Sequence, residues 1–325
     1  MILPRPAPFC GRLLKSLALL LGIVLHAQQP TFRTSVPVVI TPVSVTGKDG
    51  HPIDGLLERD FLLFDNGEPR KIEGDIIIEP IALVIAVQTS ATSAAALTKV
   101  RAVGSLIEPL ITGQRGAAAV LTFDDHLRLV QAFTRDADLL SKAFRALKPE
   151  GPGGRLLDAV GESVNLLRQG PDRHRRVLLL ISEAKDRSSE ASIEAVLTQA
   201  QRENISIYAV TYSTFLSAFS VKAHEVPPPE GMNLLALFTQ LRILSRKNAA
   251  EALTDFTGGK RYFFLKQRAL EQAVSAIGEE LHSQYLLSFT PAPESRTAYR
   301  SIEVRLPSRP DAKVRARPGY WLGEQ

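Results

Sequence analysis

The feature that most constrains this chain is the uninterrupted apolar run 81–87, which leads directly into Gln88-Thr89-Ser90-Ala91-Thr92. Such a run predicts a strand that is covered on both faces, as in a parallel sheet. In an open α/β sheet, the loop at the carboxyl end of a strand is where ligands bind. Hydroxyls on such a loop can hold a hard cation, but a divalent ion also needs carboxylates, and the first expected carboxylate is here the amide Gln88.

Charge and composition exclude one class of partner. The chain has 325 residues, 45% of them apolar, and a formal net charge of +5. Residues 1–27 hold three basic residues and no acidic one, so the rest of the chain keeps 36 basic against 34 acidic residues. A nearly neutral body lacks the basic stripe of a nucleic-acid-binding protein, so we expect no nucleic-acid partner.

The N-terminus has the pattern of a secretory signal. Arg5, Arg12 and Lys15 precede the apolar core 16–25, and the small residue at the end of Leu25-His26-Ala27 predicts a cleavage site there. The core is shorter than the roughly 20 residues that a membrane-crossing helix needs. We therefore predict a signal peptide at 1–27, a linker at 28–34 and an exported product, periplasmic or secreted, with no membrane span after cleavage. An uncleaved anchor is the alternative.

The only cysteine, Cys10, lies within the predicted signal peptide. The mature chain would therefore contain no cysteine, which excludes disulfides, thiol catalysis and thiolate metal sites.

Three regions differ in their hydrophobic pattern. Residues 35–76 show β signals, and Pro37 and Pro42 around the first run favour an edge strand. Residues 80–283 alternate strands with helices, interrupted by an insertion at 213–239 that contains three consecutive prolines. Residues 284–325 return to β patterns.

The alternating region predicts a particular set of elements. Expected strands after the first are 117–123, 127–133, 177–181, 205–211 and 262–265, and expected helices are 94–110, 136–147, 156–168, 193–202 and 270–282. This order predicts an α/β fold with a doubly wound, mainly parallel sheet in a Rossmann-type three-layer arrangement. The two flanking β segments are expected to pack together as a small accessory module.

The order and spacing of these pieces resemble the von Willebrand factor type A domain, in particular its VWFA-related acidobacterial branch. In that branch an exported chain carries an N-terminal β segment, the A-type domain and a short β tail. The resemblance covers nearly the whole mature chain. It rests on Asp60-Phe61, Phe64-Asp65-Asn66-Gly67-Glu68-Pro69, the strand 81–87, Gly153-Gly154 before Leu157-Asp158-Ala159, the strand 177–182, Gln284-Tyr285-Leu286-Leu287 and Arg317-Pro318-Gly319-Tyr320-Trp321.

The resemblance implies a metal-ion-dependent adhesion site with a first loop Asp-x-Ser-x-Ser, a threonine in a second loop and an aspartate in a third. Ser90 matches and Thr92 keeps a hydroxyl, but Gln88 departs from the pattern. Arg155 stands where the threonine belongs, in a loop one residue short, and Glu183 stands where the aspartate belongs. All three departures weaken cation binding, because Mg²⁺ favours one or two carboxylates in a strict octahedral arrangement.

We therefore expect a degenerate site without a metal cofactor, in which Ser90 and Thr92 cap the following helix. Arg155 is expected either in the vacated metal position near Glu183 or turned out to solvent. The alternative is a Mg or Mn ion held by Ser90, Thr92 and Glu183 that accepts a partner's carboxylate.

Further carboxylates lie close to these loops in the sequence. Asp124, Asp158 and Asp186 could contribute to the site, although the sequence does not aim them there.

Catalytic patterns are missing from the sequence. There is no Gly-x-Ser-x-Gly elbow around Ser90, the histidines are scattered, and the glycine-rich loop 151–154 lacks a phosphate-binding lysine. The expected function is non-catalytic recognition of an unknown protein partner outside the cytoplasm. A hydrolase with unrecognised chemistry is a second alternative, and it would need a histidine within hydrogen-bond reach of Ser90.

Overall fold

The computed structural model describes residues 38–73, 79–213, 234–291 and 299–321. All of them belong to one compact unit, Pro37–Gln325. The predicted signal peptide, the linker and residues 214–233 of the insertion lie outside the described residues.

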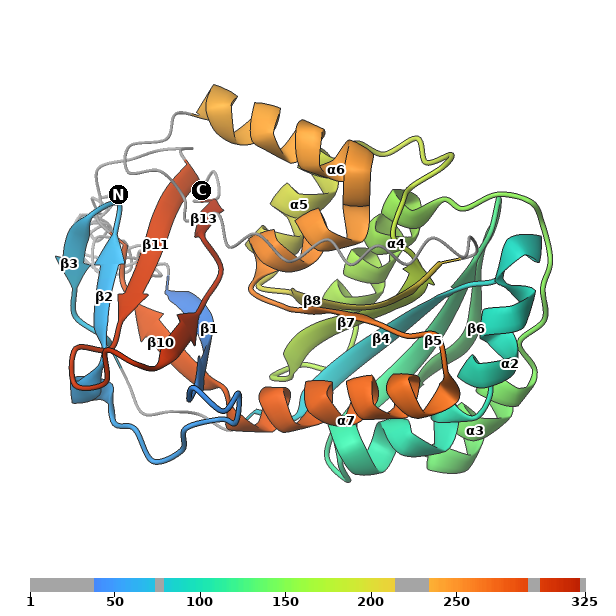
Figure 1. Cartoon of the computed structure of the whole chain (residues 1–325), viewed down its shortest axis with the longest axis horizontal. Helices are drawn as coiled ribbons and strands as arrows, with labels where there is room; N and C mark the ends of the chain where they lie inside the picture. The colour runs from blue at the N-terminus through green and yellow to red at the C-terminus, as the bar shows by residue number, and fades with distance from the viewer. Residues whose placement is uncertain (1–37, 74–78, 214–233, 292–298, 322–325) are drawn as a thin grey trace, which may run out of the picture. The chain divides into compact units, whose positions relative to one another are not determined.

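A six-stranded sheet forms the centre of the α/β part, with the strand order β6-β5-β4-β7-β8-β9 (Figure 1). All neighbouring strands are parallel except β5 and β6. The bounds are β4 (Ile81–Gln88), β5 (Ala117–Phe123), β6 (Leu127–Thr134), β7 (Arg175–Glu183), β8 (Ser206–Tyr212) and β9 (Arg261–Phe263). The predicted fold class, a doubly wound and mainly parallel sheet, is confirmed.

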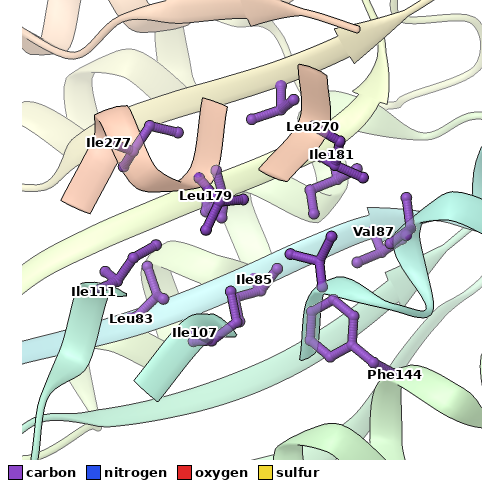
Figure 2. Close-up of a cluster of buried hydrophobic side chains, with 14 of the residues drawn as sticks. Leu83, Ile85, Val87, Ile107, Ile111, Phe144, Leu179, Ile181, Leu270 and Ile277 are labelled. Atoms are coloured by element: carbon purple, nitrogen blue, oxygen red, sulfur yellow. The ribbon is translucent and has the colours of Figure 1, made fainter. Parts of the chain in front are cut away.

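Helices cover both faces of this sheet (Figure 1). One face packs against α2 (Ala94–Val100), α3 (Ala137–Arg145) and α7 (Gln267–Ser283), and the other against α4 (Leu156–Arg168), α5 (Ile193–Arg202) and α6 (Leu234–Thr257). Successive β4 side chains point to opposite faces, so Leu83 and Ile85 enter one core while Val84 enters the other. Figure 2 shows the first of these cores around β4. The apolar run therefore fills two cores at once.

The helix expected at 94–110 is shorter than predicted. Helix α2 ends at Val100, and the chain continues as a 3₁₀ turn at Val103–Leu106 and a π turn at Glu108–Thr112. Gly104 allows this turn to touch α3, since a Cβ there would lie 2.7 Å from Phe144 Cβ. The apolar spacing identified the buried positions correctly but did not show the change of helix type.

The N- and C-terminal β segments pair with each other in two antiparallel sheets, which we call the β module. Their strand orders are β10-β1-β12 and β13-β11-β2-β3. The bounds are β1 (Val39–Thr46), β2 (Leu62–Asp65), β3 (Glu68–Arg70), β10 (Tyr285–Phe289), β11 (Tyr299–Arg305), β12 (Lys313–Arg315) and β13 (Gly319–Trp321).

The predicted edge position of the first strand is wrong, because β1 lies between β10 and β12. Strand β12 pairs only with residues 44–46, however, so Pro42 has a neighbouring strand on one side alone. A proline that lacks an N–H donor is tolerated in such a place.

Arginines of the C-terminal tail attach the β module to two helices of the α/β part. Arg315 Nη1 donates to Gly258 O at 2.6 Å and also to Gly259 O, just beyond the end of α6. Arg317 donates to Gln201 O in the last turn of α5 at 3.2 Å. The carbonyl end of a helix carries partial negative charge, which favours a cation there. Burial nevertheless lowers the pKa of Arg317 to about 10.

A buried polar network continues this junction around Gln284. The Gln284 amide donates to Ser44 Oγ at 2.7 Å and to Tyr208 OH at 3.0 Å, and its oxygen accepts from Arg175. Glu280 accepts from Tyr208 and pairs with Arg315. Strands of the sheet, helix α7 and both β segments therefore share one set of hydrogen bonds.

Within the described parts of the chain, no helix combines the length and the apolar character that a membrane crossing requires.

Arg315→Met should lower the free energy of unfolding by about 3 kcal/mol, because it leaves the Glu280 carboxylate in a largely buried site without its cation. Lys48→Met is the matched control in the same module, since the Lys48–Asp311 pair is 3.9 Å long and exposed. It should change stability by less than about 0.5 kcal/mol. Urea denaturation measures the free energy of unfolding of both variants. Equal stability would contradict the claim that Arg315 stabilises the junction between the β module and the α/β part.

Candidate ligand-binding site

Three loops meet at the carboxyl edge of the sheet, and backbone hydrogen bonds tie them together. They are the first loop (residues 88–93), the second loop (residues 150–155) and the third loop (residues 183–190). Ala91 N donates to Gly151 O at 2.9 Å, which joins the first loop to the second. Arg187 N donates to Gly154 O at 3.2 Å, which joins the third loop to the second. The structure therefore brings together the loops that the sequence singled out.

The Gln88 side chain connects the first and third loops. It is 1% exposed, and its Oε1 accepts a hydrogen bond from Glu183 N at 2.9 Å. Its Nε2 donates to Ser90 Oγ at 2.9 Å and to Glu183 Oε2 at 3.4 Å. An amide can accept and donate in this way, whereas a carboxylate could only accept. The replacement of the expected carboxylate thus builds a bond between the two loops.

An arginine outside the motif positions lies against Glu183. Arg187 Nε donates to Glu183 Oε2 at 2.9 Å and Nη2 donates to Oε1 at 3.2 Å. This bidentate geometry is the strong form of an arginine–carboxylate pair. The Glu183 side chain is 7% exposed and the Arg187 side chain 47% exposed, so the guanidinium covers a nearly buried carboxylate.

The hydroxyls of the first loop bind one another. Ser90 Oγ lies 3.0 Å from Thr92 Oγ1 and 2.8 Å from Ser93 Oγ, and Tyr212 OH donates to Ser93 Oγ at 2.7 Å. Together with the bond from Gln88, Ser90 has three partners, which matches the capacity of a hydroxyl. The expectation that Ser90 and Thr92 cap the next helix through their side chains is wrong, because neither the turn at Ala91–Ser93 nor α2 has a side-chain cap bond.

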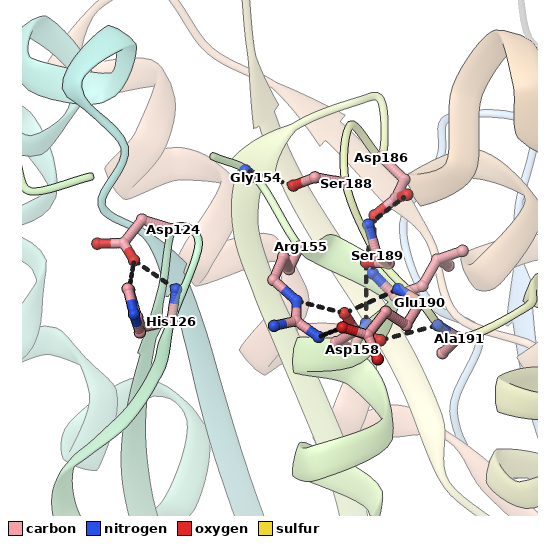
Figure 3. A network of polar contacts seen from close by, with 11 residues as sticks. Asp124, His126, Gly154, Arg155, Asp158, Asp186, Ser188, Ser189, Glu190 and Ala191 are labelled. Carbon is pink, nitrogen blue, oxygen red and sulfur yellow. Dashed lines mark hydrogen bonds and ion pairs between the residues drawn. The ribbon is translucent and has the colours of Figure 1, made fainter. Parts of the chain in front are cut away.

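Arg155 is not in the position that the sequence suggested. Its Nε donates to Asp158 Oδ2 at 2.6 Å and its Nη2 to Glu190 Oε1 at 3.1 Å, so it is neither paired with Glu183 nor turned freely to solvent (Figure 3). The residue of the second loop that faces the site is Gly154. A Cβ there would lie 3.2 Å from Gln88 Nε2 and 3.6 Å from Arg187 Cδ. The second loop therefore leaves room for Arg187.

Asp124 holds the turn between β5 and β6 against the second loop. Its carboxylate accepts hydrogen bonds from His126 N at 2.7 Å, Arg128 Nη1 at 3.0 Å and Gly151 N at 3.1 Å. Burial by itself would raise the pKa of Asp124, but these bonds outweigh burial and hold the pKa below its usual value.

Asp158 and Asp186 link the second loop and the start of α4 to the third loop. Asp158 accepts from Ala191 N at 2.9 Å and Glu190 N at 3.1 Å (Figure 3). Asp186 Oδ1 accepts from Leu157 N at 3.1 Å. Burial would raise the pKa of Asp158, but these N–H groups and Arg155 hold it below its usual value. The three aspartates thus position loops, and their bonds are not directed at Gln88.

The residues present do not fit a divalent cation in the usual manner. Gln88 is neutral, Ser90 has used its hydrogen-bonding capacity, and Glu183 is paired with a guanidinium. Glu183 carries the only carboxylate among these three residues, so a Mg²⁺ ion would have to displace the guanidinium of Arg187 to bind it.

Asp124, Asp125 and His126 can bring three ligand atoms within 4.8 Å of one another. We assign no ion to them, because Asp124 is already hydrogen-bonded as described.

The condition for a hydrolase is not met at Ser90. Its side-chain partners among the described residues are Gln88, Thr92 and Ser93, with no histidine among them.

Comparisons with known proteins concern the fold. No protein-family model matches the chain, and no curated protein matches it. Among solved structures, a von Willebrand factor type A protein from Catenulispora acidiphila is 10% identical with a TM-score of 0.46, over 77% of this chain and 52% of that one. The conserved hypothetical protein BatB from Bacteroides thetaiotaomicron is 13% identical with a TM-score of 0.43, over 61% of this chain and 99% of that one.

The von Willebrand factor domain of the type V pili tip protein Mfa5 from Porphyromonas gingivalis also matches. It is 12% identical with a TM-score of 0.42, over 62% of this chain and 95% of that one. The resemblance to von Willebrand factor A domains is thus found among solved structures as well. At such low identity and with TM-scores below 0.5, the likeness assigns no role to any residue.

Asp158→Asn should make the free energy of unfolding less dependent on pH in acid. A carboxylate whose pKa is lowered on folding stabilises the protein above its unfolded pKa of about 3.9, and this contribution is lost as the pH falls through the folded pKa. In urea denaturation from about pH 6 to about pH 2, the variant should be less stable at the upper end and approach the wild type at the lower end. Parallel curves would contradict the assigned pKa direction.

Proposed function

We propose that this chain is an exported, non-catalytic protein-binding module with a degenerate metal-ion-dependent adhesion site that works without a metal ion. The observation that carries the proposal is the bidentate pair between Arg187 and Glu183 beside the Gln88 amide. A guanidinium stays protonated at any physiological pH. The positive charge that a metal ion supplies in a metal-dependent site would therefore come here from an arginine side chain.

Several further features support a binding face at this edge. The carboxyl ends of the strands are where ligands bind in open α/β sheets. The loops there are fixed by Asp124, Asp158 and Asp186, so they form a surface that is organised before a partner arrives. A preorganised surface loses less conformational entropy on binding.

Export is proposed from the N-terminal sequence alone. A basic stretch, a short apolar core and small residues near position 27 form the pattern of a secretory signal. The lack of cysteine after residue 10 is compatible with an oxidising compartment, since the folded chain would need no disulfide there.

A calorimetric titration with Mg²⁺ and Mn²⁺ tests the metal-free state. The wild-type chain should show no saturable binding at millimolar concentrations, because the cation would have to displace Arg187 from Glu183. Micromolar binding that Ser90→Ala abolishes would overturn the proposal and favour a Mg or Mn ion held by Ser90, Thr92 and Glu183.

The double variant Gln88→Asp/Arg187→Ala is the matched positive control. It restores a carboxylate in the first loop and removes the positive charge, so it should gain measurable Mn²⁺ binding. The single variant Gln88→Asp should gain less, since Arg187 still occupies Glu183. Equal gains in the single and double variants would show that Arg187 does not exclude the ion.

A further inference from the structure

The carboxyl edge carries three arginines that each cover a buried or nearly buried carboxylate. Arg128 covers Asp124, Arg155 covers Asp158, and Arg187 covers Glu183. The side chains of Asp124 and Asp158 are 0% and 13% exposed. In each case the guanidinium lies between an inner acid and the outside of the protein.

Two of the three arginines also bind a second, outer glutamate. Arg128 Nη1 lies 2.9 Å from Glu150 Oε2, and Arg155 Nη2 lies 3.1 Å from Glu190 Oε1. These outer side chains are 45% and 86% exposed. At two places on this edge, a guanidinium that pairs with an inner carboxylate thus also pairs with an exposed glutamate.

Arg187 has the inner acid but no outer one among the described residues. Its Nε and Nη2 both donate to Glu183, which leaves the two N–H donors of Nη1 without a protein acceptor in the described parts of the chain. The Arg187 side chain is 47% exposed, more than those of Arg128 and Arg155.

We propose that Arg187 Nη1 is the docking point for a glutamate or aspartate side chain of the partner protein. This inference rests on the proposed function, because it names the chemistry of the partner at the same face. At Arg128 and Arg155, the outer acid is Glu150 or Glu190 of this chain. At Arg187, the partner's carboxylate takes the place of that outer acid. Recognition is then a direct charge-assisted hydrogen bond.

The geometry also explains why Arg187 can take a second acid. Glu183 binds the Nε and Nη2 side of the guanidinium, and the planar fork leaves the Nη1 side free to point elsewhere. Gly154 beside Arg187 carries no side chain that could cover it.

The test uses the full chain labelled with ¹⁵N and two blocked tripeptides, acetyl-Gly-Glu-Gly-amide and acetyl-Gly-Gln-Gly-amide. The blocked ends leave a single side-chain carboxylate in the first peptide and none in the second. Addition of the glutamate peptide should shift the guanidinium resonances of Arg187, assigned with Arg187→Lys, and leave those of Arg128 and Arg155 unchanged. The glutamine peptide should shift none of them.

Glu190→Gln is the gain-of-function control within the same face. It removes the outer acid of Arg155, so the Arg155 resonances should become responsive to the glutamate peptide. An Arg187 resonance that does not move, or that moves equally with both peptides, overturns the inference, whatever Arg155 does. Such a failure leaves the metal-free proposal standing, because the calorimetric titration with Mg²⁺ and Mn²⁺ decides that separately.

Discussion

The burial of carboxylates at the end of a parallel sheet is the constraint on which the candidate site depends. An unpaired buried carboxylate is strongly unfavourable, so each one needs a cation or several N–H donors. At Glu183 the cation is Arg187, while Asp124 and Asp158 combine an arginine with backbone N–H groups. The loops are held in place because these side chains must be satisfied. Among the described residues, an arginine lies against each of these three carboxylates.

At the junction with the β module, the groups that need partners are arginines and not carboxylates. There Arg317 is buried and Arg315 is partly buried, and carbonyl groups near the ends of two helices, together with Glu280, stabilise their charges. Arg315 and Arg317 are two positions apart. Arg315 donates to a carbonyl just beyond the end of α6, and Arg317 donates to a carbonyl in the last turn of α5. Since the breaking of such a pair leaves a charge without compensation, the tail contributes to the stability of the α/β part.

The hydrophobic pattern predicted the fold class because burial on both faces requires continuous apolar strands and a doubly wound order. Helices α4 and α5 begin and end where the pattern placed them. The edge position expected for β1 is wrong. A proline shows only that its own position lacks an N–H donor, and β12 pairs with residues 44–46 and does not reach Pro42. Strand partners that are far apart in the sequence cannot be read from local patterns.

At the site, the residue types and loops were predictable, but the pairing of charges was not. Gln88, Ser90 and Glu183 lie together as the motif suggested. The motif position of Arg155 predicts that it lies near Glu183 or turns out to solvent, yet Asp158 lies three residues later and pairs with it. A spacing of four residues between Glu183 and Arg187 was the available signal for the true partner. The choice between two nearby arginines depends on loop geometry that the sequence does not display.

A crystal structure of the wild-type chain grown with MnCl₂, with anomalous diffraction recorded for manganese, tests the central claim most directly. We predict that the Arg187 guanidinium lies side-on to the Glu183 carboxylate, with no anomalous peak within bonding distance of Ser90 Oγ or Glu183. A manganese peak bound by Ser90, Thr92 and Glu183, with Arg187 displaced from Glu183, would contradict it.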